Sequence, residues 1–198
     1  DKVKAEQFVL PIGKKKTHVI GINPSQITTE DLAVSLQPAA NYVPTDGYSK
    51  VAAVERHHNT GKIGVAVAKG YGIRNGAVAS SVSHDSHNII VIGDNDRDMA
   101  LAVDEIIRTQ GGYTVVENGE VFETLPLPIM GLMSDAGFES VNETLGRMIK
   151  KAHEMGVPAD IEPFITLSFL ALPVIPTLRI TPRGLCLLTA KGPEILQE

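Results

Sequence analysis

Apolar and β-branched residues recur in short runs along the chain, and turn-forming residues separate the runs. The run NIIVIG (88–93) is apolar on both faces and predicts a buried central strand. The sequence YTVVENGEVFETLPL (113–127) predicts a hairpin with Asn118-Gly119 at its tip, because this pair favours a tight two-residue turn. Further strands are predicted over 17–22, 50–57, 62–70 and 76–83.

Two segments show helical periodicity instead. A helix over 97–110 is predicted from the apolar positions Met99, Ala102, Val103, Ile106 and Ile107, with N-caps available at 94–96. A second helix is predicted over about 140–155, where Ser140 and Glu143 form the capping-box pattern. Its apolar stripe consists of Val141, Leu145, Met148, Ile149 and Ala152.

Strands mixed with two helices predict an α/β (mixed α+β) fold, a layered mixed β-sheet flanked by helices. Residues 1–48 read as a lead-in segment with one or two strands, and 49–198 as the main domain. The segment 163–188 is strongly apolar, but four prolines interrupt it and exclude one long helix.

Composition narrows the class of protein. The 198 residues carry a net charge of −5 and no long basic run, so we expect no nucleic-acid partner and no membrane association. A single cysteine, Cys186, excludes an internal disulfide and favours a reducing, cytoplasmic location. The chain begins with Asp1 rather than Met, which favours a fragment or a processed product.

Several catalytic motifs can be excluded. The glycines of KGYGIRNG (69–76) are spaced GxGxxxG, one residue too long for a dinucleotide loop, and they favour a bend between strands. The chain has no P-loop and no GxSxG motif. The HxE and PCxxC signature of zinc-dependent nucleobase deaminases requires cysteines that this sequence does not have.

The strongest chemical candidate is SHDSHN (83–88), at the entrance to the central strand. Asp85 and His87 are the candidate catalytic residues, because in an extended strand they share a face while His84 points away. Only a turn would allow His84 and His87 to hold one metal ion. Ser86 offers a hydroxyl beside them. The competing interpretation is a strand entrance whose polar side chains satisfy backbone groups.

VERHHNTGK (54–62) is a second polar cluster. Glu55 and His57 share a face if this segment is extended, and both are candidates for the border of an active site. A structural role is the stronger interpretation for this cluster.

Long stretches of the chain resemble one known family. The sequence ERHHNTGKIGVAVAKGYGIRNGAVASSVSHDSHNIIVIGDNDRDMALAV (55–103) is similar to the C-terminal domain of bacterial and archaeal adenine deaminases of the amidohydrolase superfamily. LPLPIMGLMSD (125–135) and FITLSFLALPVIPTLRITPRGL (164–185) resemble the same domain, and VIGINPSQITTE (19–30) resembles the stretch before it.

The resemblance implies a function for a longer protein. Such enzymes hydrolyse adenine to hypoxanthine and ammonia in purine salvage, with divalent manganese or iron held in a (β/α)₈ barrel. The barrel ligands begin with an HxH pair, and this sequence contains none. We therefore expect no metal ligands in this chain and no activity when it is isolated. The expected partners are the N-terminal barrel, adenine as substrate and a second copy in a homodimer.

The alternative is a non-catalytic domain for oligomerisation and docking that caps the barrel. Its partner surface would lie in the apolar tail, at Leu167, Phe169, Leu170, Leu172 and Val174.

Overall fold

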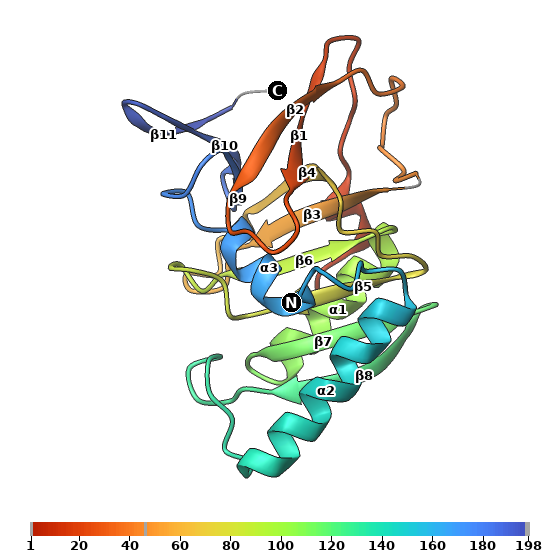
Figure 1. The fold of residues 1–198 in the computed structure, drawn as a ribbon, viewed down its shortest axis with the longest axis vertical. Helices are drawn as coiled ribbons and strands as arrows, with labels where there is room; N and C mark the ends of the chain where they lie inside the picture. The colour runs from red at the N-terminus through yellow and green to blue at the C-terminus, as the bar shows by residue number, and fades with distance from the viewer. Residues whose placement is uncertain (1, 46, 197–198) are drawn as a thin grey trace.

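The computed structural model describes residues 2–45 and 47–196, which form a large mixed sheet, a small second sheet and three α-helices (Figure 1). The elements are a 3₁₀ turn η1 (Ala5–Phe8), β1 (Thr17–Ile22), β2 (Thr29–Val34), β3 (Tyr48–Val54), β4 (Ile63–Lys69), β5 (Gly76–Ser80), β6 (Ile89–Gly93), α1 (Asp96–Arg108), β7 (Gly112–Glu117), β8 (Glu120–Pro126), α2 (Phe138–Glu154), α3 (Pro163–Leu170), β9 (Leu178–Thr181), β10 (Gly184–Thr189) and β11 (Gly192–Ile195). The predicted fold class is confirmed.

The large sheet has the strand order β2-β1-β4-β3-β6-β5-β7-β8. β1 and β4 run parallel, and every other neighbouring pair is antiparallel. β6 lies between β3 and β5 with all its residues buried, so the predicted central strand is confirmed. The lead-in segment supplies β1 and β2, which belong to the same sheet.

The two faces of the sheet bury alternate residues against different partners. On one face Ala52, Ile89 and Val91 pack with α1, whereas on the other Val51 and Ile90 pack with α2, α3 and the small sheet. Figure 1 shows α1 behind the strands and the other two helices in front of them. Each fully buried isoleucine contributes roughly 1.5–3 kcal/mol, so both faces stabilise the fold.

α1 follows its prediction closely. The Asn95 side chain accepts a hydrogen bond of 2.9 Å from the amide of Asp98 and caps the helix. Met99, Val103 and Ile106 are buried, as predicted. Ile107 is 38% exposed, so its assignment to the buried stripe is wrong.

α2 begins earlier than the capping-box pattern predicts. Its N-cap is Gly137, so Ser140 and Glu143 lie inside the helix and are exposed to solvent. The predicted cap is therefore wrong. Met148 and Ala152 are buried against the sheet, and the other stripe residues, Val141, Leu145 and Ile149, are half-buried and pack against the same core.

The apolar tail forms α3 and the small sheet, in the order β11-β10-β9. A Cβ atom at Gly64 of β4 would lie 2.0 Å from the carbonyl oxygen of Thr181, so the small sheet packs directly on the large one. Leu167 and Leu170 are buried in the main core and Leu172 is also buried, which removes three of the five residues expected on a partner surface. The tail is apolar because it completes the core of this domain.

Candidate functional site

Three loops meet at one end of the large sheet. The strand pairing places Val54 opposite Ile89, and Ser80 opposite both Ile90 and Tyr113. Tyr113 in turn lies opposite Leu125, near the end of β8. The loops that follow β3, precede β6 and follow β8 therefore begin side by side. The SHDSHN segment forms the middle loop.

This segment forms a turn rather than an extended strand entrance. The amide of His87 donates to the carbonyl of Ser83 at 2.7 Å, and the buried Ser83 hydroxyl donates to the carbonyl of Asn88 at 2.6 Å. As a result the rings of His84 and His87 approach each other, with 6.2 Å between their centroids. The expectation that His84 points to the opposite face is wrong, because these bonds close the chain on itself before β6 begins.

α3 holds the first half of the turn. The amide of His84 donates to the carbonyl of Ser168 at 3.0 Å, and the Ser168 hydroxyl donates to the carbonyl of Val82. The His84 ring packs against Phe169 with 5.0 Å between centroids. A helix near the end of the chain therefore fixes where His84 lies.

The β3–β4 loop contacts the other half. β3 ends at Val54, so Glu55 and His57 do not share a strand face and that expectation is wrong. His57 still reaches the turn, with its Nε2 atom 2.6 Å from the carbonyl oxygen of Ser86. The turn residues and His57 are thus brought together, as a site would require, and their chemical roles stay predictions.

The Glu55 carboxylate bonds the backbone of its own loop. Its carboxylate accepts hydrogen bonds from the amides of His57, His58 and Thr60 at 2.5–3.0 Å. These bonds, the one to Thr60 foremost, lower the pKa of Glu55 to about 2. The carboxylate therefore shapes its own loop and has little capacity left for a substrate.

The two predicted catalytic residues, Asp85 and His87, differ in their surroundings. Asp85 is exposed, and the Nδ1 atom of His87 is buried with no partner among the described residues. Burial, with His84 and Arg56 nearby, lowers the pKa of His87 below 6.5. A neutral imidazole at pH 7 can accept a proton or bond a polar heterocycle.

The resemblance implies a divalent metal ion, which requires several His, Cys, Asp or Glu side chains close together. Within residues 2–45 and 47–196, His, Cys, Asp and Glu side chains nowhere gather in a group of three suited to a metal ion. The residues that the structure describes therefore do not fit such an ion by themselves.

The lowered pKa of His87 gives a testable pH dependence. Folding favours its neutral form, so the related stability is complete above pH 6.5 and is lost as pH falls below that value. We expect the free energy of unfolding of wild type, relative to His87→Gln, to be larger at about pH 7.5 than at about pH 5.5. Chemical unfolding at both pH values measures this, with His58→Gln as the control. Equal pH dependence in wild type and His87→Gln would contradict it.

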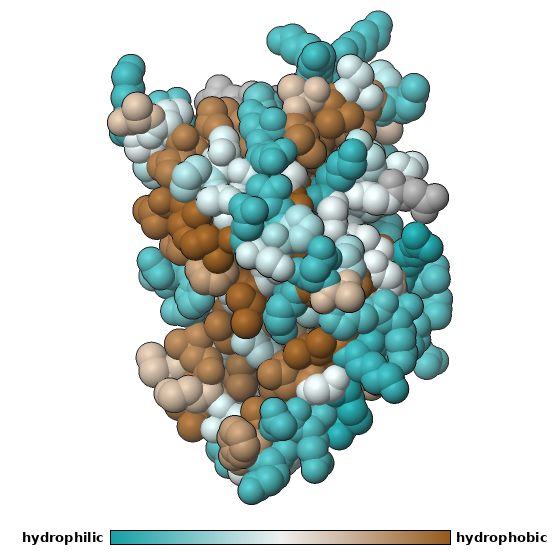
Figure 2. All heavy atoms as spheres, viewed as in Figure 1, coloured by the Kyte–Doolittle hydropathy of each residue, from teal (hydrophilic) through white to brown (hydrophobic). Residues whose placement is uncertain are grey.

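Exposed apolar side chains lie beside the turn. Ile129, Met130 and Met133 follow β8 and are 44%, 75% and 53% exposed. Figure 2 shows apolar side chains gathered along the left edge, from the region of α3 and β10 to the loops beside α2. An apolar surface around exposed polar groups is typical of a face that another protein surface covers.

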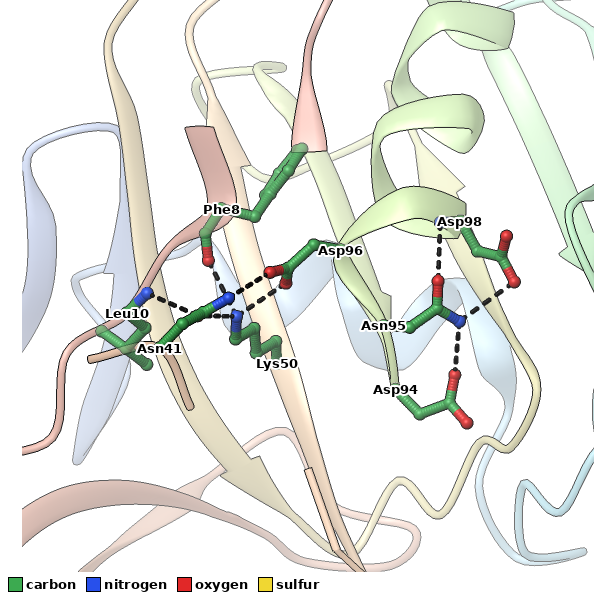
Figure 3. Close-up of polar contacts among 8 residues, drawn as sticks. All are labelled: Phe8, Leu10, Asn41, Lys50, Asp94, Asn95, Asp96 and Asp98. Carbon is green, nitrogen blue, oxygen red and sulfur yellow. Dashed lines mark hydrogen bonds and ion pairs between the residues drawn. The ribbon is translucent and has the colours of Figure 1, made fainter. Parts of the chain in front are cut away.

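A separate polar cluster, the Lys50 cluster, surrounds Lys50, which is fully buried within β3 (Figure 3). Its ammonium donates to the carbonyl of Phe8 at 3.0 Å, to Asn41 at 2.6 Å and to Asp96 at 2.6 Å. Burial lowers the pKa of Lys50, although the pair with Asp96 acts in the opposite direction.

This Lys50 cluster is structural. An ammonium group has three donors, and all three bind protein acceptors here. The bonds fasten η1 and the segment around Asn41 to the start of α1. Sequence reasoning missed the cluster, and its one signal was a lysine within the otherwise apolar strand YSKVAAV (48–54).

The structure thus defines a mixed α/β domain with a histidine-bearing turn at one end of its sheet. Comparison with known proteins identifies the class: the model of the adenine deaminase C-terminal domain family matches residues 26–191. The chain belongs to this family.

Named relatives extend the comparison. The adenine deaminase of Desulfitobacterium hafniense (strain Y51) is 51% identical over 185 residues, which are 92% of this chain and 32% of that protein. That of Nitratidesulfovibrio vulgaris (strain DP4) is 50% identical over 181 residues, or 90% of this chain and 32% of that protein. Adenine deaminase of Clostridium acetobutylicum is 43% identical over 187 residues, or 92% and 33%. The chain spans about a third of the length of these relatives.

Proposed function

We propose that this chain is the C-terminal part of an adenine deaminase, which hydrolyses adenine to hypoxanthine and ammonia in purine salvage. Family membership over residues 26–191 supports this, as do relatives that bear that name. These relatives are about three times as long as the part that this chain matches. The remaining part supplies the metal-dependent barrel.

The observation that carries the proposal is the SHDSHN turn. Asp85 is exposed, and the His87 ring is partly exposed, with a buried Nδ1 atom that has no partner in the described structure. Adenine presents ring nitrogens and an amino group, which a carboxylate and a neutral imidazole can bond. We assign Asp85 and His87 to proton transfer or to binding of the purine. His84, Ser86 and His57 border them.

The other components follow from the same proposal. A divalent ion, manganese or iron, is held by the barrel and not tightly by this chain. The full-length protein is a cytoplasmic homodimer that acts on a small purine. The part of the chain that the structure describes has no helix long and apolar enough to cross a membrane.

A second candidate function is a non-catalytic docking and oligomerisation domain. The exposed Ile129, Met130 and Met133 favour it, because they place an apolar surface next to the turn. Both functions hold together if this face covers the mouth of the barrel. They differ in whether the turn touches adenine.

The isolated chain is expected not to deaminate adenine, because a complete site requires the barrel. The measurement is hypoxanthine formation by the purified chain and by the full-length enzyme, each with and without manganese. Activity confined to the full-length enzyme supports the proposal. Metal-dependent turnover by the chain alone, in a preparation free of host deaminase, would contradict it.

A further inference from the structure

Arg56 joins two of the loops that form the candidate site. Its Nε atom donates to the carbonyl of His87 at 2.6 Å, and its Nη2 atom donates to the carbonyl of Met130 at 2.7 Å. Its own amide donates to the side chain of Asn88 at 3.3 Å. One side chain therefore holds the end of the SHDSHN turn against the loop that follows β8.

Burying the Arg56 guanidinium costs free energy, and an ion pair is the usual way to offset that cost. Arg56 is half-buried, and burial lowers its pKa. Among the residues that the structure describes, no carboxylate lies within ion-pair distance of Arg56. The guanidinium donates from Nε and from Nη2 to backbone carbonyls of two different loops, so it gives both loops a defined position.

The backbone segments that contact the Arg56 guanidinium pack closely around it. His87 and Met130 adopt positive φ angles of 49° and 59°, which are unfavourable for residues other than glycine. Gly131 follows with φ +76°, and a Cβ atom there would lie 2.6 Å from both terminal nitrogens of Arg56. The buried Ser81 hydroxyl also donates to the carbonyl of Gly131 at 2.6 Å. Only glycine leaves room for the guanidinium at this point.

We propose that Arg56 is a positioning residue for the deamination reaction. By bonding the carbonyls of both His87 and Met130, Arg56 holds His87 in place in the site. The proposal rests on the proposed function of the turn. α3 holds the His84 end through Ser168, and Arg56 holds the His87 end. The two anchors together determine how the histidines are presented to a ligand.

Arg56→Lys tests the geometry while it keeps the positive charge. A lysine ammonium is a point charge and cannot reproduce the planar fork that spans two carbonyls. In the full-length enzyme we expect kcat for adenine to fall on the order of 10- to 100-fold, because a displacement near 1 Å can have that effect. KM should change little and the melting temperature should stay close to wild type.

Arg56→Gln tests the charge in addition. Arg56 helps to lower the pKa of His87, so its removal should raise that pKa and move the acidic limb of the kcat/KM profile to higher pH. In Arg56→Lys the limb should stay in place. A role limited to folding would change neither the limb nor kcat per folded molecule. Arg108→Lys, an exposed arginine paired with Glu105, is the matched control.

Gly131→Ala provides a second test: the added methyl group displaces the guanidinium without changing Arg56, and alanine at φ +76° also strains the backbone of this loop. It should lower kcat as Arg56→Lys does. Wild-type kcat in both variants, with a reduced rate in His87→Ala, would overturn the positioning role and leave the proposed function intact. Wild-type kinetics in His87→Ala would instead reject the function of the turn. Loss of fold in both Arg56→Lys and Gly131→Ala would assign Arg56 to folding and also overturn the proposal.

Discussion

Replacing His87 with alanine in the full-length enzyme is expected to lower kcat/KM for adenine by about 10²- to 10⁴-fold, the contribution of a side chain that transfers protons. The free energy of unfolding should fall by only about 1 kcal/mol, as for an ordinary point mutant. The ring is partly exposed and its Nδ1 atom has no partner among the described residues, so few interactions are lost. Steady-state kinetics and chemical unfolding on the same preparation measure both effects.

Asp85→Ala should behave in the same way, because its carboxylate is exposed and its loss leaves no buried partner. His84→Ala should also impair the rate, since the turn places the two histidine rings together. His58→Ala is the control, an exposed histidine in the adjacent loop. Wild-type kinetics in both Asp85→Ala and His87→Ala would reduce the turn to a structural feature.

Replacing Lys50 with methionine should destabilise the domain by about 3 kcal/mol, which is typical when one partner of a buried ion pair is removed. Asp96 would lose its paired cation, and the Asn41 side chain and the carbonyl of Phe8 would each lose a hydrogen-bond donor. The Asp96 side chain is 18% exposed, so solvent can relieve part of the loss. Chemical unfolding of the full-length enzyme, followed at this domain by hydrogen exchange, measures the change.

Lys62→Met is the matched control for this prediction. Lys62 is exposed, so its replacement should change stability by no more than about 0.5 kcal/mol. Lys50→Met should also loosen η1 and the start of α1, the two segments that the ammonium connects. Equal stability in the two variants would show that Lys50 does not hold η1 and the start of α1 together.

Much of the sheet could be predicted from local sequence. NIIVIG is apolar on both faces because β6 is covered on both faces, and Asn118-Gly119 adopts the positive φ angles of 52° and 82° that its hairpin turn requires. α1 was predictable because its apolar spacing and its N-cap agree. In each case one short segment contains the whole physical reason.

The site was only partly predictable, since contacts between distant segments determine it. The polar residues of SHDSHN were visible, but the turn depends on Ser168 and Arg56, which lie far from it in the sequence. Without those contacts an extended strand entrance was the simplest expectation. The apolar tail was misassigned for a related reason, because Leu167 and Leu170 are buried by strand residues that lie far from them in the sequence.

Chemical modification of the histidines tests most directly whether the turn borders the adenine pocket. The full-length enzyme is treated with diethylpyrocarbonate with and without saturating hypoxanthine, and peptide mass spectrometry follows His84, His87 and His58. We predict that hypoxanthine slows modification of His84 and His87 and leaves exposed His58 unchanged. Equal modification of the turn histidines with and without the ligand would contradict their place in the site.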